Sequence, residues 1–411
     1  MSFKDLKLIK PLLKAVEASG YASPTLVQQK GIPAILDRKD VIISAQTGTG
    51  KTATYALPIL QQLFDRQDAP KRGKKIRALI ISPTRELASQ IKQNFKSYGQ
   101  FSNLRAYTIF GGTSIEPQVD VLKKGIDILV ATPGRLLDLH KQDFINLDYV
   151  ENLVLDEADL MLALGFIDDV KKIERLCPEN KQTLLLSATM PYKIEQLANG
   201  ILKDPVRIDV TVTNSITKDI SQTLYYVPKR RKIELCLHLL RNEIKGNVLI
   251  FRRTKFGVKK LEDRLAEKGY RVDSLHGDKN QSDRQTALNK FKNGYAKILI
   301  ATDVAARGID INELDNVLNF DMPNVAEIYI HRIGRTGRAG NIGNAYSMCS
   351  ADERNYIKTI EALIDVQIPI IQDHPYPLDP KAKPPVHKKK GSRYKKGRKS
   401  AASKKKKKRW Y

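Results

Sequence analysis

Three carboxylates stand close together near the middle of the chain, directly after an apolar run. Asp156, Glu157 and Asp159 follow residues 153–155, Leu-Val-Leu, which have the character of a buried strand. Burial of a charge is unfavourable unless a partner compensates it. A metal ion is one such partner, and the free N–H groups at the start of a helix are another. The rest of the sequence decides between them.

A glycine-rich loop in the first part of the chain suits a chain of phosphates. The segment AQTGTGKT, residues 45–52, follows the apolar strand 41–43 and leads into a helical stretch, 53–60. Gly48 and Gly50 let the backbone curl so that its N–H groups face a phosphate chain, and the helix start adds a partial positive charge. The segment is nearly the P-loop pattern, with alanine in place of the first glycine.

The P-loop gives the three acids a role. We expect Lys51 to reach the β- and γ-phosphates of a nucleotide and Thr52 to bind Mg²⁺. In P-loop proteins an acid on a second strand helps to hold the metal ion, and Asp156 occupies such a place. Glu157 is placed to orient or deprotonate an attacking water. Asp159 either begins the following helix or contacts another motif.

The elements that must position these residues repeat one pattern of apolar run, polar turn and amphipathic stretch. Runs such as 78–81, 128–131 and 298–301 are almost continuously apolar, which is typical of parallel strands buried on both faces. Strands that alternate with helices predict an α/β fold with doubly wound sheets.

We expect four segments along the chain. Residues 1–209 would form the first domain and residues 221–370 the second, joined by a polar linker, 210–220, that lacks periodicity. Residues 371–411 are rich in Pro and Lys. They would form a disordered basic tail, because such a composition cannot bury a core.

The charge of the chain indicates a polyanionic partner. The net charge is +26, and residues 381–411 contribute sixteen Lys and Arg with no Asp or Glu. A basic excess of this kind favours nucleic acid, although a solvated tail that only aids solubility is the alternative. The sequence has no apolar run of membrane-spanning length and no secretory h-region, so we expect no membrane partner. Its three scattered cysteines fit a reducing, cytoplasmic location.

From about Phe3 to Met348 the sequence resembles the DEAD-box ATP-dependent RNA helicases of superfamily 2. Residues 156–159 spell the name, and the other motifs follow in the family's order. The resemblance implies two tandem RecA-like domains, each a mostly parallel sheet with helices on both faces. It also implies ATP and Mg²⁺ as cofactors and RNA as the partner. The compact core and short basic tail are similar to the small bacterial branch around RNA helicase E.

The adenine side of the site is implied by a second motif. GYASPTLVQ, residues 20–28, resembles the family's Q motif, with Phe3 upstream at the usual spacing. The resemblance implies that the Gln28 amide, which donates and accepts at once, pairs with adenine while Phe3 stacks on the base. Asp310 would contact the ribose. The implied nucleotide-binding residues are Phe3, Gln28, Ala45, Gln46, Thr47, Gly48, Thr49, Gly50, Lys51, Thr52 and Asp310.

The stretch HRIGRTGRAG, residues 331–340, carries three arginines and a histidine beside three glycines, which suits an anion clamp. By resemblance, Arg335 and Arg338 are arginine fingers that reach the γ-phosphate from the second domain. The implied catalytic residues are Lys51, Asp156, Glu157, Arg335 and Arg338. Coupling of hydrolysis to strand separation is implied for Asp159, Ser187, Thr189 and His331.

Several loops resemble the family's RNA-backbone motifs: PTREL (83–87), Gly111-Gly112 and TPGR (132–135) in the first domain. Hydroxyl, glycine N–H and guanidinium groups suit phosphate contacts that carry no sequence information. With residues of the second domain added, the implied RNA-binding set is Pro83, Thr84, Arg85, Gly112, Thr132, Gly134, Arg135, Gln281, Arg284 and Thr302.

Each half of the chain carries only part of the implied machinery, so ATP and RNA would bind across both halves and favour each other's binding. The resulting prediction is RNA-stimulated ATP hydrolysis with local, non-processive unwinding of RNA duplexes and RNP remodelling, in ribosome assembly or RNA turnover, by a monomeric core. Ribosomal or RNA-decay complexes are candidate partners. One alternative is an ATP-dependent RNA clamp or scaffold with little unwinding. The other is a DNA helicase, against which the Q motif, DEAD and PTREL together argue.

Overall fold

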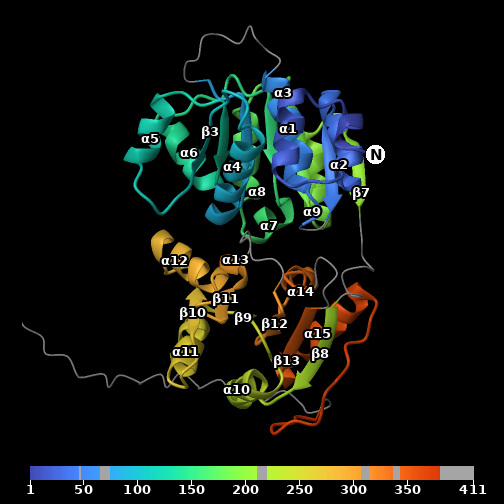
Figure 1. Cartoon of the computed structure of the whole chain (residues 1–411), viewed down its shortest axis with the longest axis vertical. Coiled ribbons are helices and arrows are strands. Elements are labelled where there is room, and N and C mark those ends of the chain that lie inside the picture. Colours follow the sequence, from blue (N-terminus) through green and yellow to red (C-terminus); the bar gives the residue numbers. More distant parts are fainter. Residues whose placement is uncertain (46–47, 65–74, 211–219, 307–313, 337–342, 380–411) are drawn as a thin grey trace, which may run out of the picture.

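A computed structural model describes residues 1–45, 48–64, 75–210, 220–306, 314–336 and 343–379 of the 411-residue chain. Two parallel sheets, each with helices on both faces, lie one above the other (Figure 1). This arrangement confirms the predicted fold class of two tandem RecA-like domains.

The first sheet has seven parallel strands in the order β3-β4-β2-β5-β6-β1-β7. All residues of β1, β2, β4, β5 and β6 are buried, as their continuous apolar character predicted. The strands are β1 (Val41–Ala45), β2 (Ala78–Ile81), β3 (Ala106–Ile109), β4 (Ile128–Ala131), β5 (Asn152–Leu155), β6 (Gln182–Ser187) and β7 (Val206–Val210).

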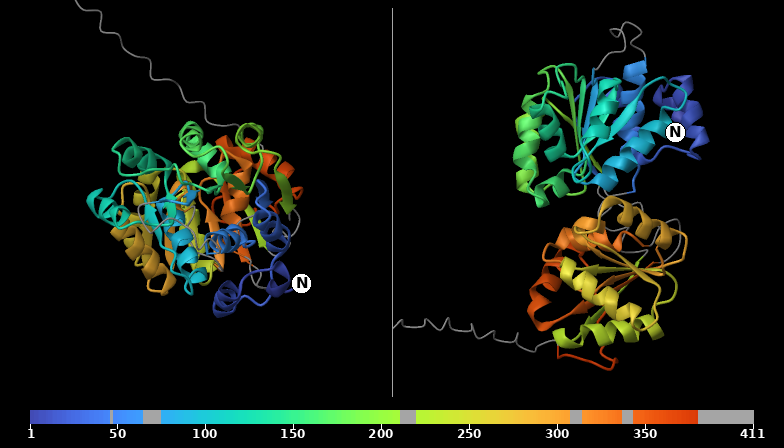
Figure 2. Two further views of the ribbon diagram at one scale, coloured as in Figure 1. Left: turned by 90° about the horizontal axis from the view of Figure 1, so that it is seen from above. Right: turned by 90° about the vertical axis from the view of Figure 1, so that its left-hand side faces the viewer.

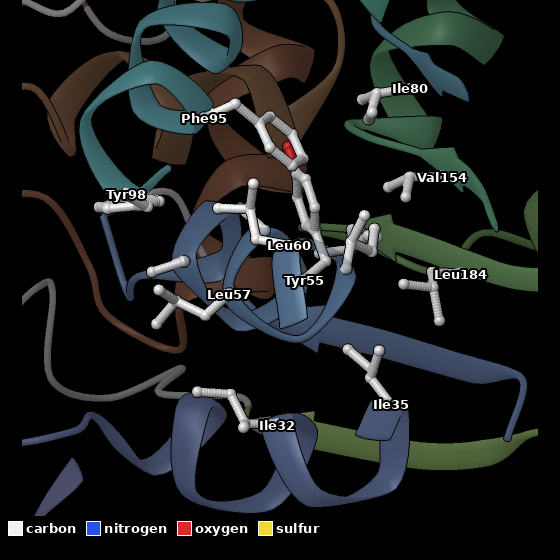
Figure 3. Close-up of a cluster of buried hydrophobic side chains, with 14 of the residues drawn as sticks. Ile32, Ile35, Tyr55, Leu57, Leu60, Ile80, Phe95, Tyr98, Val154 and Leu184 are labelled. Carbon is white, nitrogen blue, oxygen red and sulfur yellow. The ribbon is translucent and has the colours of Figure 1, made fainter. Parts of the chain in front are cut away.

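The helices of the first domain divide between the two faces of this sheet. On one face, η1 and α1–α4 enclose a core that includes Ile80, Val154 and Leu184; on the other, α5–α9 cover Leu79, Leu153 and Leu185 (Figure 3 shows part of the first core). The helices are η1 (Phe3–Leu6), α1 (Lys10–Ala18), α2 (Leu26–Leu36), α3 (Lys51–Phe64), α4 (Arg85–Tyr98), α5 (Glu116–Lys123), α6 (Pro133–Lys141), α7 (Ala158–Ala163), α8 (Ile167–Arg175) and α9 (Tyr192–Ile201).

The second sheet has six parallel strands in the order β10-β11-β9-β12-β13-β8. Helices α10 and α11 cover one face, whereas α12, α14 and α15 pack on the other. The strands are β8 (Ile220–Tyr226), β9 (Val248–Arg252), β10 (Val272–Leu275), β11 (Ile298–Thr302), β12 (Asn316–Asn319) and β13 (Gly343–Cys349). The helices are η2 (Lys229–Arg231), α10 (Lys232–Asn242), α11 (Lys255–Ala266), α12 (Gln281–Lys292), α13 (Asp303–Ala306), α14 (Ala326–Ile333), η3 (Ala351–Glu353) and α15 (Arg354–Ile364).

The carboxyl ends of the strands decide where the predicted site residues gather. In a sheet of parallel strands these ends lie along one edge, and ligands of open α/β sheets bind there. The two domains turn these edges toward each other, so α7 of the first domain and α12–α14 of the second lie at their junction (Figures 1 and 2).

The start of the predicted tail differs from the disordered segment that we expected from 371 onward. Ile371 N–H donates to Leu224 O and Leu378 N–H donates to Tyr226 O, so the segment follows the edge strand β8. Ile371 and Tyr376 also pack against the core under α10. The unused backbone groups of an edge strand explain this pairing, because β8 has a neighbouring strand on one side only. The rest of the tail, 380–411, lies outside the described residues.

Within the described ranges, no helix combines the length and the apolar character that crossing a bilayer requires.

Candidate nucleotide and RNA site

A cavity of about 650 Å³ lies at the junction of the two domains. The first domain contributes the P-loop, the DEAD acids and one face of α4, and the second contributes α14 and Arg335, two positions after its end. The cavity brings together these members of the predicted site: Gly48, Gly50, Lys51, Thr52, Asp156, Glu157, Asp159, Thr189, His331 and Arg335.

The P-loop turn depends on glycine at two positions. Gly48 has a φ of 84° and Gly50 a φ of 87°, in the left-handed region that glycine adopts without steric cost. A Cβ atom at Gly50 would lie 2.4 Å from Gln28 Nε2, so this turn also packs closely against the Q motif. Lys51 and Thr52 then begin α3 with their side chains at the cavity.

Lys51 is a buried cation among three acids. Its side chain is 6% exposed, and Nζ lies 3.3 Å from Glu157 Oε1. Burial lowers the pKa of Lys51, but the charges of Glu157, Asp156 and Asp159 outweigh burial and raise it. An ammonium group has three donors, and the ion pair with Glu157 uses one of them. A buried cation with donors to spare fits a phosphate oxygen.

Asp156 directly follows β5 and is almost fully buried. Its Oδ2 accepts a hydrogen bond of 2.9 Å from the Tyr55 hydroxyl. Burial raises the pKa of Asp156, and the Glu157 carboxylate raises it further, whereas Lys51 and Tyr55 act in the opposite direction. The Asp156 carboxylate and the Thr52 hydroxyl are hard oxygen donors, which Mg²⁺ prefers. In the described part of the chain no three acid, His or Cys side chains form a metal cage, and Mg²⁺ at nucleotides needs none, since phosphates and waters complete its shell.

Glu157 has an unusual backbone conformation. Its φ is 54° and its ψ is 56°, in the left-handed region that non-glycine residues rarely adopt. The residue stands at the N-cap of α7, so the conformation turns the chain sharply from β5 into the helix. Strain of this kind is held in place only by surrounding contacts and clusters at functional sites.

Asp159 connects three parts of the molecule. Its Oδ2 accepts hydrogen bonds of 3.1 Å from the Thr189 N–H and hydroxyl groups, and its own N–H donates to Ser187 Oγ at 3.2 Å. From the second domain, His331 Nε2 lies 3.7 Å from the same Oδ2. These are the contacts that we expected of the coupling residues; the coupling itself stays a prediction.

The Q motif is tied to the P-loop. Thr25 and Gln28 form a capping box at the start of α2, in which Gln28 Oε1 accepts from Thr25 N–H at 2.9 Å. Gln28 Nε2 donates to Gly50 O at 3.3 Å, and the Thr25 hydroxyl donates to Thr49 O at 2.8 Å. An amide oxygen accepts two hydrogen bonds and an amide nitrogen donates two, so Oε1 and Nε2 of Gln28 each have capacity for one more, on a side chain that is 3% exposed.

The aromatic side chain at the cavity is not the one we predicted. Phe3 is 6% exposed and packs into the core, whereas Tyr21 is 41% exposed and lines the cavity. The two rings stack with centroids 6.3 Å apart, and the Tyr21 hydroxyl contacts that of Tyr98 on α4 at 2.8 Å. The exposed ring face is therefore that of Tyr21. The sequence did indicate Tyr21 as a candidate for this position, because Tyr21 lies within the Q motif itself.

The structure separates two of the three arginines that we grouped in one clamp. His331 and Arg335, four positions apart, face the cavity, whereas Arg332 is 2% exposed on the opposite side. Arg332 donates to both oxygens of Asp303, at 2.6 and 2.8 Å, and thereby ties α14 to α13. Helical spacing alone predicts this difference, since Arg332 shares a face with the buried Tyr329.

The predicted RNA residues lie at one side of the junction, at the starts of three helices. Thr84 caps α4, Thr132 precedes α6, and Asn280 caps α12. N-terminal ends of helices attract phosphates. The predicted residues at these starts or beside them are Pro83, Thr84, Arg85, Gly112, Thr132, Gly134, Arg135, Gln281 and Arg284, and Thr302 ends β11.

Arginines concentrate positive charge on this side. Burial lowers the pKa of Arg85, and the neighbouring charges of Arg284 and Arg135 lower it further, although Glu86 opposes them. Arg135 Nη2 donates to Thr113 O at 3.0 Å, whereas its Nη1 has no acceptor in the ranges that the structure covers. Like charges held this close favour the binding of an anion.

The structure places Arg284 in contacts within the protein, whereas its predicted contact with RNA stays a prediction. Its side chain is 9% exposed, and Nε donates to Glu86 Oε1 of the first domain at 2.6 Å. The remaining guanidinium nitrogens donate to His276 O and Ala305 O. These contacts engage the Arg284 guanidinium group with acceptors of the protein itself, and the one with Glu86 links the two domains.

Removal of either partner of this ion pair is expected to weaken domain closure. Arg284→Ala and Glu86→Gln should each lower RNA affinity in the presence of ADP and beryllium fluoride by about tenfold, equivalent to about 1.4 kcal/mol. The double variant should be no weaker than the singles, because the two residues act through one contact. Arg264→Ala, which breaks an exposed 2.8 Å ion pair with Glu267, serves as the matched control and should have no effect. Additive losses in the double variant would contradict the contact.

Four predicted residues lie outside the described residues: Gln46, Thr47, Asp310 and Arg338. Ala45 ends β1 and is buried, and Thr49 is partly exposed.

Comparisons with known proteins agree with this site. The DEAD/DEAH box helicase model matches residues 25–197, and the helicase conserved C-terminal domain model matches residues 231–340. The DEAD-box ATP-dependent RNA helicase RhpA of Helicobacter pylori is 41% identical over 371 residues, which are 90% of this chain and 74% of that protein. The chain therefore belongs to the DEAD-box family of ATP-dependent RNA helicases.

Two solved structures resemble the whole chain. The S. cerevisiae protein Dbp5 bound to RNA and ADP BeF3 is 30% identical, with a TM-score of 0.80 over 90% of this chain and 95% of that one. A DEAD box protein from Methanococcus jannaschii is 38% identical, but its TM-score is 0.51 over 90% and 99% of the two chains. Of these two proteins, the one with the higher sequence identity therefore has the lower TM-score.

Proposed function

We propose that this protein hydrolyses ATP in response to RNA and uses the cycle to unwind short RNA duplexes locally and to remodel RNA–protein complexes. The observation that carries the proposal is the cavity itself, in which the P-loop and DEAD acids of one domain meet Arg335 and His331 of the other. A site that is complete only across two domains makes hydrolysis depend on their closure.

Within this proposal the first domain holds the nucleotide. Lys51 binds the β- and γ-phosphates, and Gln28 reads the adenine with Tyr21 against the base. Thr52 and Asp156 would hold Mg²⁺, which supplies charge neutralisation of the phosphates. Glu157 accepts the proton of the attacking water, and its fixed N-cap position orients that proton transfer.

The second domain completes the site only on closure. Arg335 carries a permanent charge that would stabilise the charge on the transferred phosphoryl group. The contact between Asp159 and His331 would depend on domain closure. Asp159 would couple closure to Ser187 and Thr189, with which it shares hydrogen bonds. The TM-score is higher for the RNA-bound Dbp5 structure than for the Methanococcus jannaschii protein, which supports an arrangement of the domains near that of the RNA-bound protein.

The test measures ATP hydrolysis without nucleic acid, with single-stranded RNA and with DNA of matched sequence, followed by release of one strand from a short RNA duplex. We expect stimulation by RNA only, and ATP-dependent strand release. Equal stimulation by DNA would contradict the proposal. RNA stimulation without strand release would favour the clamp or scaffold instead.

The wider role that we propose is ribosome assembly or RNA turnover in the cytoplasm, with a monomeric core that engages ribosomal or RNA-decay complexes. Its support is the family of the chain and the basic composition of residues 381–411.

Deletion of residues 381–411 is expected to weaken RNA binding without loss of turnover at saturating RNA. Lysine contacts to phosphates give sequence-independent affinity that falls steeply with salt. The RNA dissociation constant should therefore rise about tenfold at moderate salt, with a smaller difference at high salt, and the salt slope of binding should flatten. A collapse of saturated ATP turnover would show that these residues do more than tether RNA.

A further inference from the structure

Tyr55 is a polar group in the middle of an apolar core. Its ring is fully buried and packs against Phe95, with centroids 6.1 Å apart (Figure 3). Phenylalanine would serve this packing equally well. A buried hydroxyl needs a hydrogen-bond partner, because burial without one is costly.

The partner of this hydroxyl is an acid of the site. Tyr55 Oη donates to Asp156 Oδ2 at 2.9 Å, and the two residues are 101 positions apart. Lys51 and Tyr55 lie one helical turn apart on α3, so both side chains point toward the DEAD acids. Thr52 lies on the same turn of α3. The hydroxyl therefore contacts Asp156, one of the two residues that would hold Mg²⁺, from the helix that carries the other.

We propose that Tyr55 is a positioning residue for Mg²⁺: it fixes the Asp156 carboxylate, which lines the cavity, through Oδ2 and leaves the other oxygen for the metal ion. A phenol is protonated at neutral pH, so it donates to the carboxylate in every step of the cycle. Partners that orient a metal-binding carboxylate contribute about 10- to 100-fold to metal affinity. The inference rests on the proposed function, since it concerns the same nucleotide site.

The alternative is that the hydroxyl only compensates the burial of Asp156. In that case its removal would lower stability and leave Mg²⁺ affinity unchanged. The two roles therefore differ in one measurable quantity, the Mg²⁺ concentration at which nucleotide affinity is half-maximal.

The experiment titrates a fluorescent ATP analogue into the full chain at a series of Mg²⁺ concentrations, without RNA. Tyr55→Phe should raise the half-maximal Mg²⁺ concentration about tenfold. Tyr329→Phe is the matched control, because Tyr329 is equally buried and its hydroxyl donates to Gln222 at 2.8 Å, away from the site. Its Mg²⁺ dependence should equal that of the wild type. Thermal unfolding in EDTA checks that each variant is folded.

An unchanged Mg²⁺ midpoint in folded Tyr55→Phe overturns the inference, whether or not stability falls. If that variant does not fold, wild-type protein labelled with ¹³Cζ-tyrosine gives the answer. Bound Mn²⁺ should broaden one tyrosine resonance more than the others, and that resonance should shift when Mg²⁺ joins the nucleotide. The absence of such a shift overturns the inference. A wild type whose nucleotide affinity ignores Mg²⁺ would instead refute the proposed function itself.

Discussion

Glu157→Gln is expected to lower RNA-stimulated ATP turnover by about 10³-fold while nucleotide and RNA still bind. A positioned general base contributes about 10²- to 10⁴-fold to a rate, and an amide cannot accept the proton of the attacking water. Glutamine has the size of glutamate, so the turn from β5 into α7 should persist. The pair with Lys51, at 3.3 Å, loses its charge but not its geometry. Steady-state turnover at saturating ATP and RNA is the measurement.

The matched control for this substitution is Glu179→Gln, an exposed acid of the same domain outside the cavity. Its turnover should equal that of the wild type. A second readout separates chemistry from binding. Because hydrolysis would end the closed state, the Glu157→Gln protein should hold RNA for longer in the presence of ATP than the wild type does. Normal turnover in Glu157→Gln would place the base elsewhere.

Arg335→Ala is expected to lower turnover by about 10³-fold, with ATP still bound by the first domain. An arginine that stabilises a transferred phosphoryl group contributes about 10³- to 10⁵-fold to the rate. The side chain lies at the cavity, and its backbone is held where Leu314 N–H donates to Arg335 O at 3.2 Å. Removal of the side chain should therefore leave the second domain folded. Single-turnover hydrolysis measures the chemical step directly.

Two further variants sharpen this result. Arg335→Lys should remain strongly impaired, because an ammonium group lacks the two-pronged geometry of guanidinium. Arg231→Ala removes an exposed arginine of the same domain, which pairs with Glu234 and lies over the Tyr376 ring, and should hydrolyse ATP normally. If Arg335→Ala turned over ATP at the wild-type rate, the cavity between the domains would not be the site of hydrolysis.

Most of the fold was predictable because its signals are local. The strands β1, β2, β4, β5 and β6 are buried on both faces, and such strands are mostly apolar, so their apolar runs are visible in the sequence. The P-loop was equally clear, since Gly48 and Gly50 occupy conformations that other residues avoid. The family and its ATP-dependent chemistry follow from motifs in order along the chain.

The direction of individual side chains was not predictable in the same way. Phe3 and Tyr21 are both aromatic, and only the packing of η1 into the core decides that Tyr21 faces the cavity. Arg284 matches an RNA-binding motif, yet the approach of Glu86 from the other domain turns it into a link between domains. Sequence motifs state which groups are present, and contacts between distant segments decide what each group meets.

Tyr55 and the segment after Ile371 illustrate the same limit. The sequence by itself determined two parallel α/β domains, a phosphate loop, a set of acids and a basic chain, because periodicity, glycine conformation and charge are properties of short segments. Only the tertiary structure placed the Tyr55 hydroxyl on Asp156 and residues 371–379 along β8. Each of these contacts joins segments about a hundred residues or more apart, and hydrogen-bond partners at such separations are set by the packing of whole sheets and helices rather than by local pattern.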